Sequence, residues 1–390
     1  MKLKIAQVTP YYYPSVGGVS GVCQYLSEEL VKLGHKVDVI TARRDHKGRP
    51  KLNAPKHEVI NGVNVFRYES IINIGHMSFF PSLINHLISK KYDVVHFHSY
   101  RHPLCDISAV LGKVKSSVTI LHGHGPFFEK NEISSTKQKI YHIYDKFAYH
   151  TLFKLTDKVI ALNNYEKKRY TDIGIDSQKI DVIPNAASAD CFVKTDNREF
   201  ISNYNLSDKK VLLFVGILNN FKRPDLLIEA LPKIIKEVNN VHLLLVGPDG
   251  GMLEKVTQLA KDLNVEEYYS WLGPLQGTEK QKAYESAHIF VLPSDWDAYP
   301  LVLMEALAHG LPCVTTDCRG PVDIVEHGKT GFVVKKRDTD GIADNIIRLL
   351  KNDELYNKFS RNAKMVAERK YKADSIAKEI EDLYYKLIKS

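Results

Sequence analysis

The sequence predicts an α/β protein with two Rossmann-like domains. Short apolar runs alternate with amphipathic stretches that are long enough for crossover helices, a pattern typical of parallel sheets built from βαβ units. The same pattern begins again after a turn-rich segment at Pro184 and Asn185. A chain of 390 residues gives each domain enough length for a core of its own.

The first half begins with a buried strand at residues 3–8 and a glycine-rich turn at Gly17 and Gly18. A helical period of apolar residues follows and ends at Gly34, a residue type that favours helix termination. Further apolar runs predict strands at residues 37–41, 94–98, 118–122 and 158–162.

The second half repeats this order, because a turn-rich linker near residues 184–196 is followed by a new series of strands. We therefore assign residues 1–190 to an N-terminal domain and residues 196–372 to a C-terminal domain. We predict an amphipathic helix in residues 373–390, which could pack on either domain, including back on the N-terminal domain. The predicted strands of the second series are residues 210–216, 242–247, 269–273, 289–293 and 312–316.

The composition favours a folded protein of a reducing compartment. Hydrophobic residues make up 44% and charged residues 26% of the chain, close to globular averages. The five cysteines form no C-x-x-C motif, which suits free thiols better than a disulfide framework. The N-terminal apolar stretch is too short for a signal peptide, and no run of about 18 apolar residues exists. We therefore expect a cytoplasmic protein without a membrane-spanning helix.

Basic residues are concentrated in the first half of the chain. Residues 1–195 carry 27 Lys and Arg against 17 Asp and Glu, whereas residues 196–390 carry 27 against 29. This asymmetry predicts an anionic partner for the first half, such as a membrane surface or a phosphorylated acceptor, with a merely solvated lysine-rich surface as the alternative. We expect no nucleic-acid partner. The basic clusters chosen for membrane contact are Arg43, Arg44, Lys47 and Arg49, and Lys90 with Lys91.

The turn at Gly17 and Gly18 opens a helix and is a candidate phosphate site. Glycine allows a ligand to approach the backbone closely, and the start of a helix offers free N–H groups. The spacing is G-G-x-x-G rather than the Rossmann G-x-G-x-x-G, so it does not indicate a dinucleotide site. A simple tight turn is the alternative.

Histidines gather in two of the predicted strands of the first half. His122 and His124 stand at the carboxyl end of the strand at 118–122, where ligands bind in open α/β sheets, and a structural role is the alternative. We expect His96 and His98 to face opposite sides of their strand, so that they cannot share a metal ion. Since no carboxylate or cysteine supports them at a suitable spacing, we predict no metal site.

The strongest segment for function is residues 292–312. A strand, an acidic loop and a helix follow one another, with Pro300 suited to the first helical position and Gly310 to the position after the helix. Asp297 before the helix and Glu305 within it could hold two sets of sugar hydroxyls. The N–H groups of the helix start would then hold phosphate between them.

These segments resemble the retaining glycosyltransferases of family 4 (glycosyl transferases group 1), which have the GT-B fold. The acidic loop and helix are similar to the E-x7-E region of that family, and the resemblance extends along nearly the whole chain. Other matching segments are Gly34-His35-x-Val37 (G-H-x-V), Asp93-Val94-Val95-His96-x-His98 (D-V-V-H-x-H), Ile183-Pro184-Asn185 (I-P-N), and Phe214-Val215-Gly216 followed by Lys222 (F-V-G and its lysine).

The resemblance implies two domains that face a cleft and an enzyme that uses a UDP- or GDP-linked sugar without a metal or other cofactor. The acceptor would be a lipid-linked compound or a saccharide. Lys222 would neutralise the donor diphosphate, with Arg223 as a substitute because Ile217 stands where the family carries arginine. Residues implied to line the donor are Gly17, Gly18, Gly216, Leu275, Tyr299, Pro300, Leu301 and Val302.

The same resemblance assigns the remaining roles. Glu305 would hold the donor ribose, and Asp297 would contact the transferred sugar with a side chain one methylene shorter than the usual glutamate. His124, or alternatively His122, would lie near the reacting sugar. Pro300 replaces the common glycine and removes one backbone N–H from the phosphate loop.

Three rival interpretations stay open. Asp295-Trp296-Asp297 spells the Asp-x-Asp of metal-dependent GT-A enzymes, although two similar α/β halves favour GT-B. A sugar-nucleotide 2-epimerase of the same fold would need acids and bases around C2 of the sugar. A donor-binding pseudoenzyme is suggested by Ile217.

Overall fold

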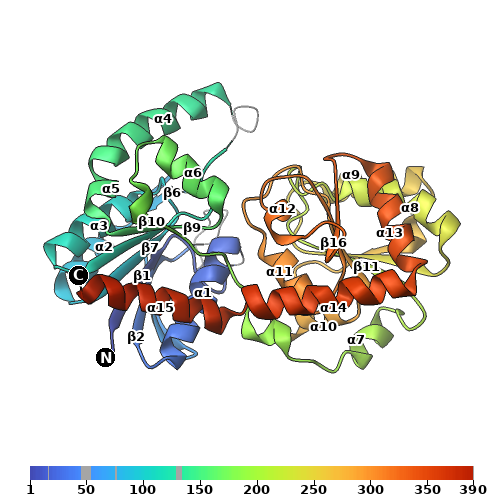
Figure 1. Ribbon diagram of the computed structural model, residues 1–390, viewed down its shortest axis with the longest axis horizontal. Coiled ribbons are helices and arrows are strands. Elements are labelled where there is room, and N and C mark those ends of the chain that lie inside the picture. Colours follow the sequence, from blue (N-terminus) through green and yellow to red (C-terminus); the bar gives the residue numbers. More distant parts are fainter. Residues whose placement is uncertain (16, 45–53, 75–76, 129–133, 390) are drawn as a thin grey trace. The chain divides into compact units, whose positions relative to one another are not determined.

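The computed structural model describes residues 1–15, 17–44, 54–74, 77–128 and 134–389, and the chain divides into two compact units. Unit 1 comprises Met1–Asn185 together with Ala373–Ser390, and unit 2 comprises Ala186–Lys372. The chain therefore enters unit 2 inside the predicted linker and returns to unit 1 for its last helix. The predicted fold class is confirmed, because each unit is a parallel sheet with helices packed on it (Figure 1).

Unit 1 is built on an eight-stranded sheet in the order β10-β9-β8-β7-β1-β2-β4-β3, parallel apart from the pairing of β3 with β4. Every residue of β7 is buried, as in sheets whose two faces are both covered. The strand order reverses between β1 and β7, and ligands of such sheets bind at the carboxyl ends beside this switch point. The strands are β1 (Lys4–Thr9), β2 (Lys36–Ala42), β3 (His57–Ile60), β4 (Val63–Tyr68), β7 (Val94–His98), β8 (Val118–His122), β9 (Lys158–Ala161) and β10 (Ile180–Val182), with a separate hairpin of β5 (Ile72–Ile74) and β6 (Met77–Phe79).

The last helix, α15 (Ala373–Lys389), belongs to unit 1 and packs against α1. Its apolar face is buried at Ile376, Ile380 and Tyr384, as the 3.6-residue period of this stretch predicts. The other helices of unit 1 are α1 (Gly18–Lys32), α2 (Ser82–Ser89), α3 (Pro103–Val114), α4 (Ser135–His150), α5 (Leu152–Leu155), α6 (Asn164–Asp172) and a short 3-10 helix at Ser177–Lys179.

Unit 2 has a six-stranded parallel sheet in the order β13-β12-β11-β14-β15-β16, with its switch point between β11 and β14. The strands are β11 (Lys210–Val215), β12 (Val241–Val246), β13 (Tyr269–Trp271), β14 (Ile289–Leu292), β15 (Cys313–Thr316) and β16 (Gly331–Val334). The helices are α7 (Arg198–Asn203), α8 (Asp225–Glu237), α9 (Leu253–Asp262), α10 (Gly277–Glu285), α11 (Leu301–Ala308), α12 (Pro321–Ile324), α13 (Thr339–Leu350) and α14 (Asp353–Lys370), with 3-10 helices at Ala189–Phe192 and Glu266–Tyr268.

The five cysteines are all buried free thiols, as predicted. Among the described residues, every helix is too short or too polar to cross a membrane.

Candidate functional site

Lys222 and Asp297 form an ion pair at the switch point of unit 2. Lys222 lies in the loop after β11, where the Asn219 side chain accepts hydrogen bonds from the backbone N–H groups of Phe221 and Lys222, both at 3.0 Å. Asp297 lies in the loop after β14, and the two loops are joined because Asp295 N–H donates to the Phe221 carbonyl at 2.8 Å. Two residues that are 75 positions apart thus meet through adjacent strands.

Arg223 and Arg337 neutralise Asp295, the other acid of the loop after β14. The Arg223 guanidinium lies 3.3 Å from one carboxylate oxygen of Asp295 and also holds Asp225 at 2.9 Å, while Arg337 lies 2.8 Å from Asp295. Arg223 adopts a positive φ of 51°, a conformation that is uncommon outside glycine. Both acids of Asp295-Trp296-Asp297 are therefore already paired with cations, which does not favour a metal ion between them.

Glu305 is buried in the middle of α11 and is held by two partners. Lys280 lies 2.8 Å from one carboxylate oxygen, and the Tyr284 hydroxyl donates to the other at 2.8 Å. Burial alone would raise the pKa of Glu305, but Lys280 and Tyr284 outweigh it and hold the pKa below its ordinary value. The side chain is thus a carboxylate in position to accept further hydrogen bonds.

The loop into α11 departs from the sequence prediction at one point. The helix begins at Leu301, so Pro300 is the N-cap residue and not the first helical residue. The missing N–H of proline costs little at the N-cap as well, because the first N–H groups of a helix have no partner within the helix. Gly310 does follow the C-terminus of α11, with a φ of 74°. Tyr299 is buried, and Leu301 and Val302 are half-buried.

Two further predicted donor residues of unit 2 lie near the ends of its strands. Gly216 follows β11 and packs against Gly247 so tightly that a Cβ at Gly247 would lie 1.9 Å from the Gly216 carbonyl oxygen. Leu275 is half-buried in the loop after β13, and Trp271 of that strand donates its indole N–H to the Gly247 carbonyl at 2.9 Å. These loops all leave the same edge of the sheet.

In unit 1, the start of α1 leaves space on one side of its glycines. Gly18 is the first residue of the helix, and a Cβ added there would have no neighbour within 4 Å. At Gly17 the nearest atom would be the Ser20 oxygen at 3.7 Å. The protein's own packing does not require glycine at either position, which leaves close approach of a ligand as a reason for them.

Four histidines of unit 1 form one stack, in which His96, His98 and His122 are buried and His124 is half-buried. The rings of His96 and His98 lie 4.7 Å apart, those of His98 and His124 5.1 Å apart, and those of His122 and His124 4.0 Å apart. The expectation that His96 and His98 face opposite sides of their strand was wrong. Side chains two residues apart on a strand share one face, since the period is two.

The stack consists of neutral imidazoles. Burial lowers the pKa of all four histidines, to about 3 for His122. Among the described residues, the Nε2 atom of His96 and both ring nitrogens of His122 have no hydrogen-bond partner. The ring planes of His96, His98 and His122 lie within 12° to 30° of one another. A metal ion lies in the plane of each imidazole that binds it, so nearly parallel rings do not converge on one ion, although their nitrogens lie within 4.8 Å.

His124 occupies a strained turn directly after β8. Its φ is 60° and that of Gly125 is 68°, and a side chain at Gly123 would collide with the Tyr170 hydroxyl at 2.0 Å. Left-handed backbone at a residue other than glycine costs about 1–3 kcal/mol and gathers at functional sites. This geometry favours His124 over His122, which lies within the strand, as the ligand-facing residue.

Sequence reasoning missed two side chains that hold these sites. Lys280 pairs with Glu305, and Gln7 of β1 bonds His98. Neither belongs to a motif, so no local signal marks them.

Two family profiles match the chain: Glycosyltransferase Family 4 over residues 16–190 and Glycosyl transferases group 1 over residues 196–366. The N-acetyl-alpha-D-glucosaminyl L-malate synthase of Bacillus anthracis is 28% identical over 100% of this chain and 98% of its own. An Escherichia coli galactosyltransferase that acts on GlcNAc-diphosphoundecaprenol is 28% identical over 79% of each chain.

Solved structures share the fold at lower identity. A glycosyltransferase from Rickettsia africae has a TM-score of 0.79 at 19% identity, and the match covers 100% of this chain and 99% of that one. Anabaena HepE in complex with UDP has a TM-score of 0.78 at 16% identity, covering 98% and 100%.

Proposed function

The chain belongs to the family 4 glycosyltransferases of the GT-B fold and uses a nucleotide-sugar donor, and we propose that it transfers the sugar to a lipid-linked or saccharide acceptor with retention of configuration. The observation that supports this most is the pair Lys222–Asp297 at the switch point of unit 2. The lysine suits the donor diphosphate, and the carboxylate beside it suits a hydroxyl group of the sugar.

In this proposal Lys222 exchanges Asp297 for the donor diphosphate and stabilises the charge that develops as the sugar leaves. Comparable preorganised donors contribute roughly 2.7–4 kcal/mol to the barrier. The released Asp297 accepts a hydrogen bond from the transferred sugar, and Glu305 accepts from the ribose. The start of α11 supplies N–H groups to the phosphates, and Arg223 adds a second cation.

Retention would follow from attack on the same face that the diphosphate leaves, with the leaving phosphate taking the proton of the acceptor hydroxyl. The protein's part is then to hold the sugar and stabilise charge, with His124 of unit 1 proposed to bind a sugar hydroxyl. No covalent nucleophile is required.

The test is incubation with a panel of UDP- and GDP-linked sugars, with separate assays for free nucleotide, free sugar and epimer. Transfer or slow donor hydrolysis that releases UDP or GDP is the expected result. An epimer without released nucleotide would favour the epimerase, and tight binding without any product would favour the pseudoenzyme.

The proposed anionic membrane contact needs a different surface from the clusters chosen by sequence. Arg43 pairs with Glu69 at 2.7 Å, Arg44 is buried, and Lys90 pairs with Asp38 at 2.9 Å, so their charges are engaged within unit 1. Lys47 and Arg49 lie outside the described residues. Of these clusters, Lys91 is the exposed member among the described residues.

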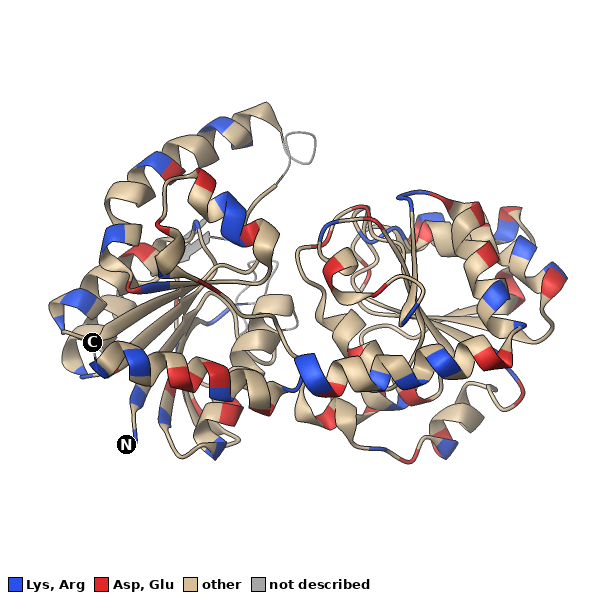
Figure 2. Ribbon diagram, in the orientation of Figure 1, with Lys and Arg blue, Asp and Glu red and all other residues tan. Residues whose placement is uncertain are grey.

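Helix α4 offers the better surface. Ile140, Ile143 and Phe147 lie on one helical face and are 56%, 68% and 63% exposed. Lys139 and Lys146 flank this stripe, and Figure 2 shows the basic residues spread along α4. An exposed apolar stripe bordered by lysines fits the interface of an anionic bilayer, where each basic residue contributes about 1 kcal/mol.

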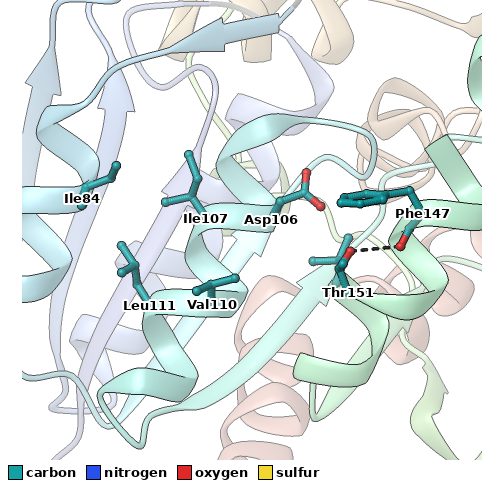
Figure 3. A pocket seen from close by; sticks show the side chains of 8 residues that line it. Ile84, Asp106, Ile107, Val110, Leu111, Phe147 and Thr151 are labelled. Atoms are coloured by element: carbon teal, nitrogen blue, oxygen red, sulfur yellow. Dashed lines mark hydrogen bonds between the residues drawn. The ribbon is translucent and has the colours of Figure 1, made fainter.

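Next to the stripe, Phe147 borders an apolar hollow of about 360 Å³ between α2, α3 and α4 (Figure 3). Its other lining residues include Ile84, Ile107, Val110 and Leu111.

Binding to vesicles with anionic lipid should fall as salt rises. Ile143→Asp should abolish this binding, whereas Val322→Asp, at an exposed valine of unit 2, should not. Equal binding of both variants would exclude this surface.

A further inference from the structure

A chain of hydrogen bonds runs through unit 1 from α15 to His124. The Gln7 side-chain amide lies 3.4 Å from the Tyr384 hydroxyl through its nitrogen and 2.7 Å from His98 Nε2 through its oxygen. His98 Nδ1 lies 2.8 Å from His124 Nε2. The Tyr384 hydroxyl also lies 2.7 Å from His96 Nδ1. The Gln7 amide is therefore hydrogen-bonded directly to His98, and it is linked to His124 through His98 and to His96 through Tyr384.

The amide dictates where each proton sits. Its oxygen only accepts, so His98 must carry its proton on Nε2, and a neutral His98 then has a bare Nδ1. His124 Nε2 must therefore donate to His98, which leaves Nδ1 of His124 as an acceptor. On the other side, the amide N–H donates to Tyr384, whose own proton goes to His96.

The opposite arrangement would need the amide to be reversed. If the Gln7 nitrogen faced His98, His98 would donate from Nδ1 to His124, and His124 would carry its proton on Nδ1. The Tyr384 hydroxyl can donate or accept and so fits both arrangements. Among the described residues, no carboxylate is hydrogen-bonded to these histidines, so the amide orientation is the feature that selects between the two.

We propose that Gln7 is a positioning residue that holds His124 in the tautomer with a bare Nδ1, ready to accept a hydrogen bond from a hydroxyl of the transferred sugar. The inference rests on the proposed function in one respect, that His124 binds the sugar. A neutral acceptor suits a hydroxyl group, whereas a ring with N–H groups at both nitrogens would suit an anion. The tautomer therefore directs unit 1 toward the sugar rather than the diphosphate.

The test pairs a spectroscopic readout with kinetics. In protein labelled with ¹⁵N at histidine, two-bond proton–nitrogen correlations assign the tautomer of each ring. We expect His98 and His124 to carry their protons on Nε2. Gln7→Met, which keeps the volume and removes both hydrogen bonds, should mix the tautomers of both rings. It should also lower kcat by at least about tenfold, since a wrong tautomer can cost 10⁴-fold in a catalytic triad, with little change in the KM of the donor.

Two variants guard against a folding artefact. Tyr384→Phe removes one of the two hydrogen bonds that hold the Gln7 amide in place but keeps the ring, so it should mix the same tautomers with a smaller loss of kcat. Glu381→Gln alters the bond from α15 to His35 at 2.7 Å and should leave the tautomers of His98 and His124 unchanged. If Gln7→Met does not fold, Tyr384→Phe decides the question.

The outcomes separate the inference from the proposed function. Nδ1–H tautomers in the unchanged protein, or mixed tautomers with unchanged turnover in Gln7→Met, would overturn the inference. Tautomers as expected in a protein that uses none of the nucleotide sugars would instead overturn the role of His124 in transfer.

Discussion

The candidate site of unit 1 and that of unit 2 satisfy their polar side chains in different ways. In unit 2, Lys222 with Asp297 and Lys280 with Glu305 pair full charges. In unit 1, neutral histidines share hydrogen bonds through Gln7, and among the described residues neither ring nitrogen of His122 has a hydrogen-bond partner. Charge pairs are strong but weakly directional, whereas an imidazole chain with fixed protons is directional and carries no charge.

This difference indicates which part of a donor the candidate site of each unit suits. A diphosphate carries charge, so it needs cations that can exchange one anionic partner for another. A sugar carries only hydroxyls, and discrimination among hydroxyls depends on donors and acceptors at fixed places. The predictions that follow test whether charge governs unit 2 and proton position governs unit 1.

The largest effect is expected at Lys222. Lys222→Ala should lower kcat about 10²–10³-fold, because it removes a cation aimed at the leaving diphosphate. Steady-state kinetics with the best nucleotide sugar measures this loss. Lys351→Ala is the matched control, since Lys351 forms an exposed pair with Glu237 in the same unit. Turnover of Lys222→Ala equal to that of the control would mean that charge does not govern unit 2.

At Glu305 we expect weaker donor binding rather than slower chemistry. Hydrogen bonds to a charged group contribute about 1.5–3 kcal/mol, so Glu305→Ala should raise the Kd of UDP or GDP at least about tenfold. Calorimetry measures the change. Glu305→Gln should raise this Kd less than Glu305→Ala does, because the glutamine side chain can keep the contact with Tyr284.

The control for Glu305 is Glu326→Ala, which breaks a surface pair with Lys370 at 2.9 Å and should leave binding unchanged. Equal losses in both variants would remove Glu305 from the donor site.

In unit 1 the neutral histidines should make the free energy of unfolding fall as the solution becomes acidic. The folded pKa of His122, about 3, lies below the unfolded value of about 6.5. The unfolded chain therefore binds more protons in this range, and stability is lost as the pH falls below about 6.5, by up to about 1.4 kcal/mol per pH unit for each such histidine.

Urea unfolding at pH 7 and pH 5 tests this expectation. His122→Phe keeps a ring in the stack and should make the fall in stability shallower. His142→Phe, at an exposed histidine of α4, should not change the slope. If the free energy of unfolding falls with pH equally in the unchanged protein and both variants, His122 is not the cause of the loss of stability in acid.

The fold could be predicted wherever burial is uniform. Strands β7 and β8 match the predicted residues 94–98 and 118–122, because all of β7 and four of the five residues of β8 are buried and most of their side chains are apolar. The β3–β4 hairpin at the sheet edge was missed, since seven of its ten strand residues are exposed or half-buried and its apolar pattern is weak. The short strands β10 and β16, which also lie at sheet edges, were missed as well.

The sites could be predicted only as far as motifs reach. The strand, loop and helix that carry Asp297 and Glu305 follow one another as expected. Gln7 could not be found, because its hydroxyl partner Tyr384 lies 377 residues away and only the packing of α15 brings the two together. The faces of His96 and His98 could have been predicted from the strand period, and the error came from its misapplication.

The smallest effect expected is that of metal removal. In unit 2 the acids of Asp295-Trp296-Asp297 already face Lys222, Arg223 and Arg337, so a divalent cation would have to displace these side chains and meet their charge. Turnover should therefore be the same after dialysis against EDTA as before it, and added Mn²⁺ should not raise it. Activity that EDTA abolishes and Mn²⁺ restores would mean that a metal ion, not the lysine and arginines, holds the diphosphate. The charge pairs of unit 2 would then be a resting arrangement that the donor and its metal replace.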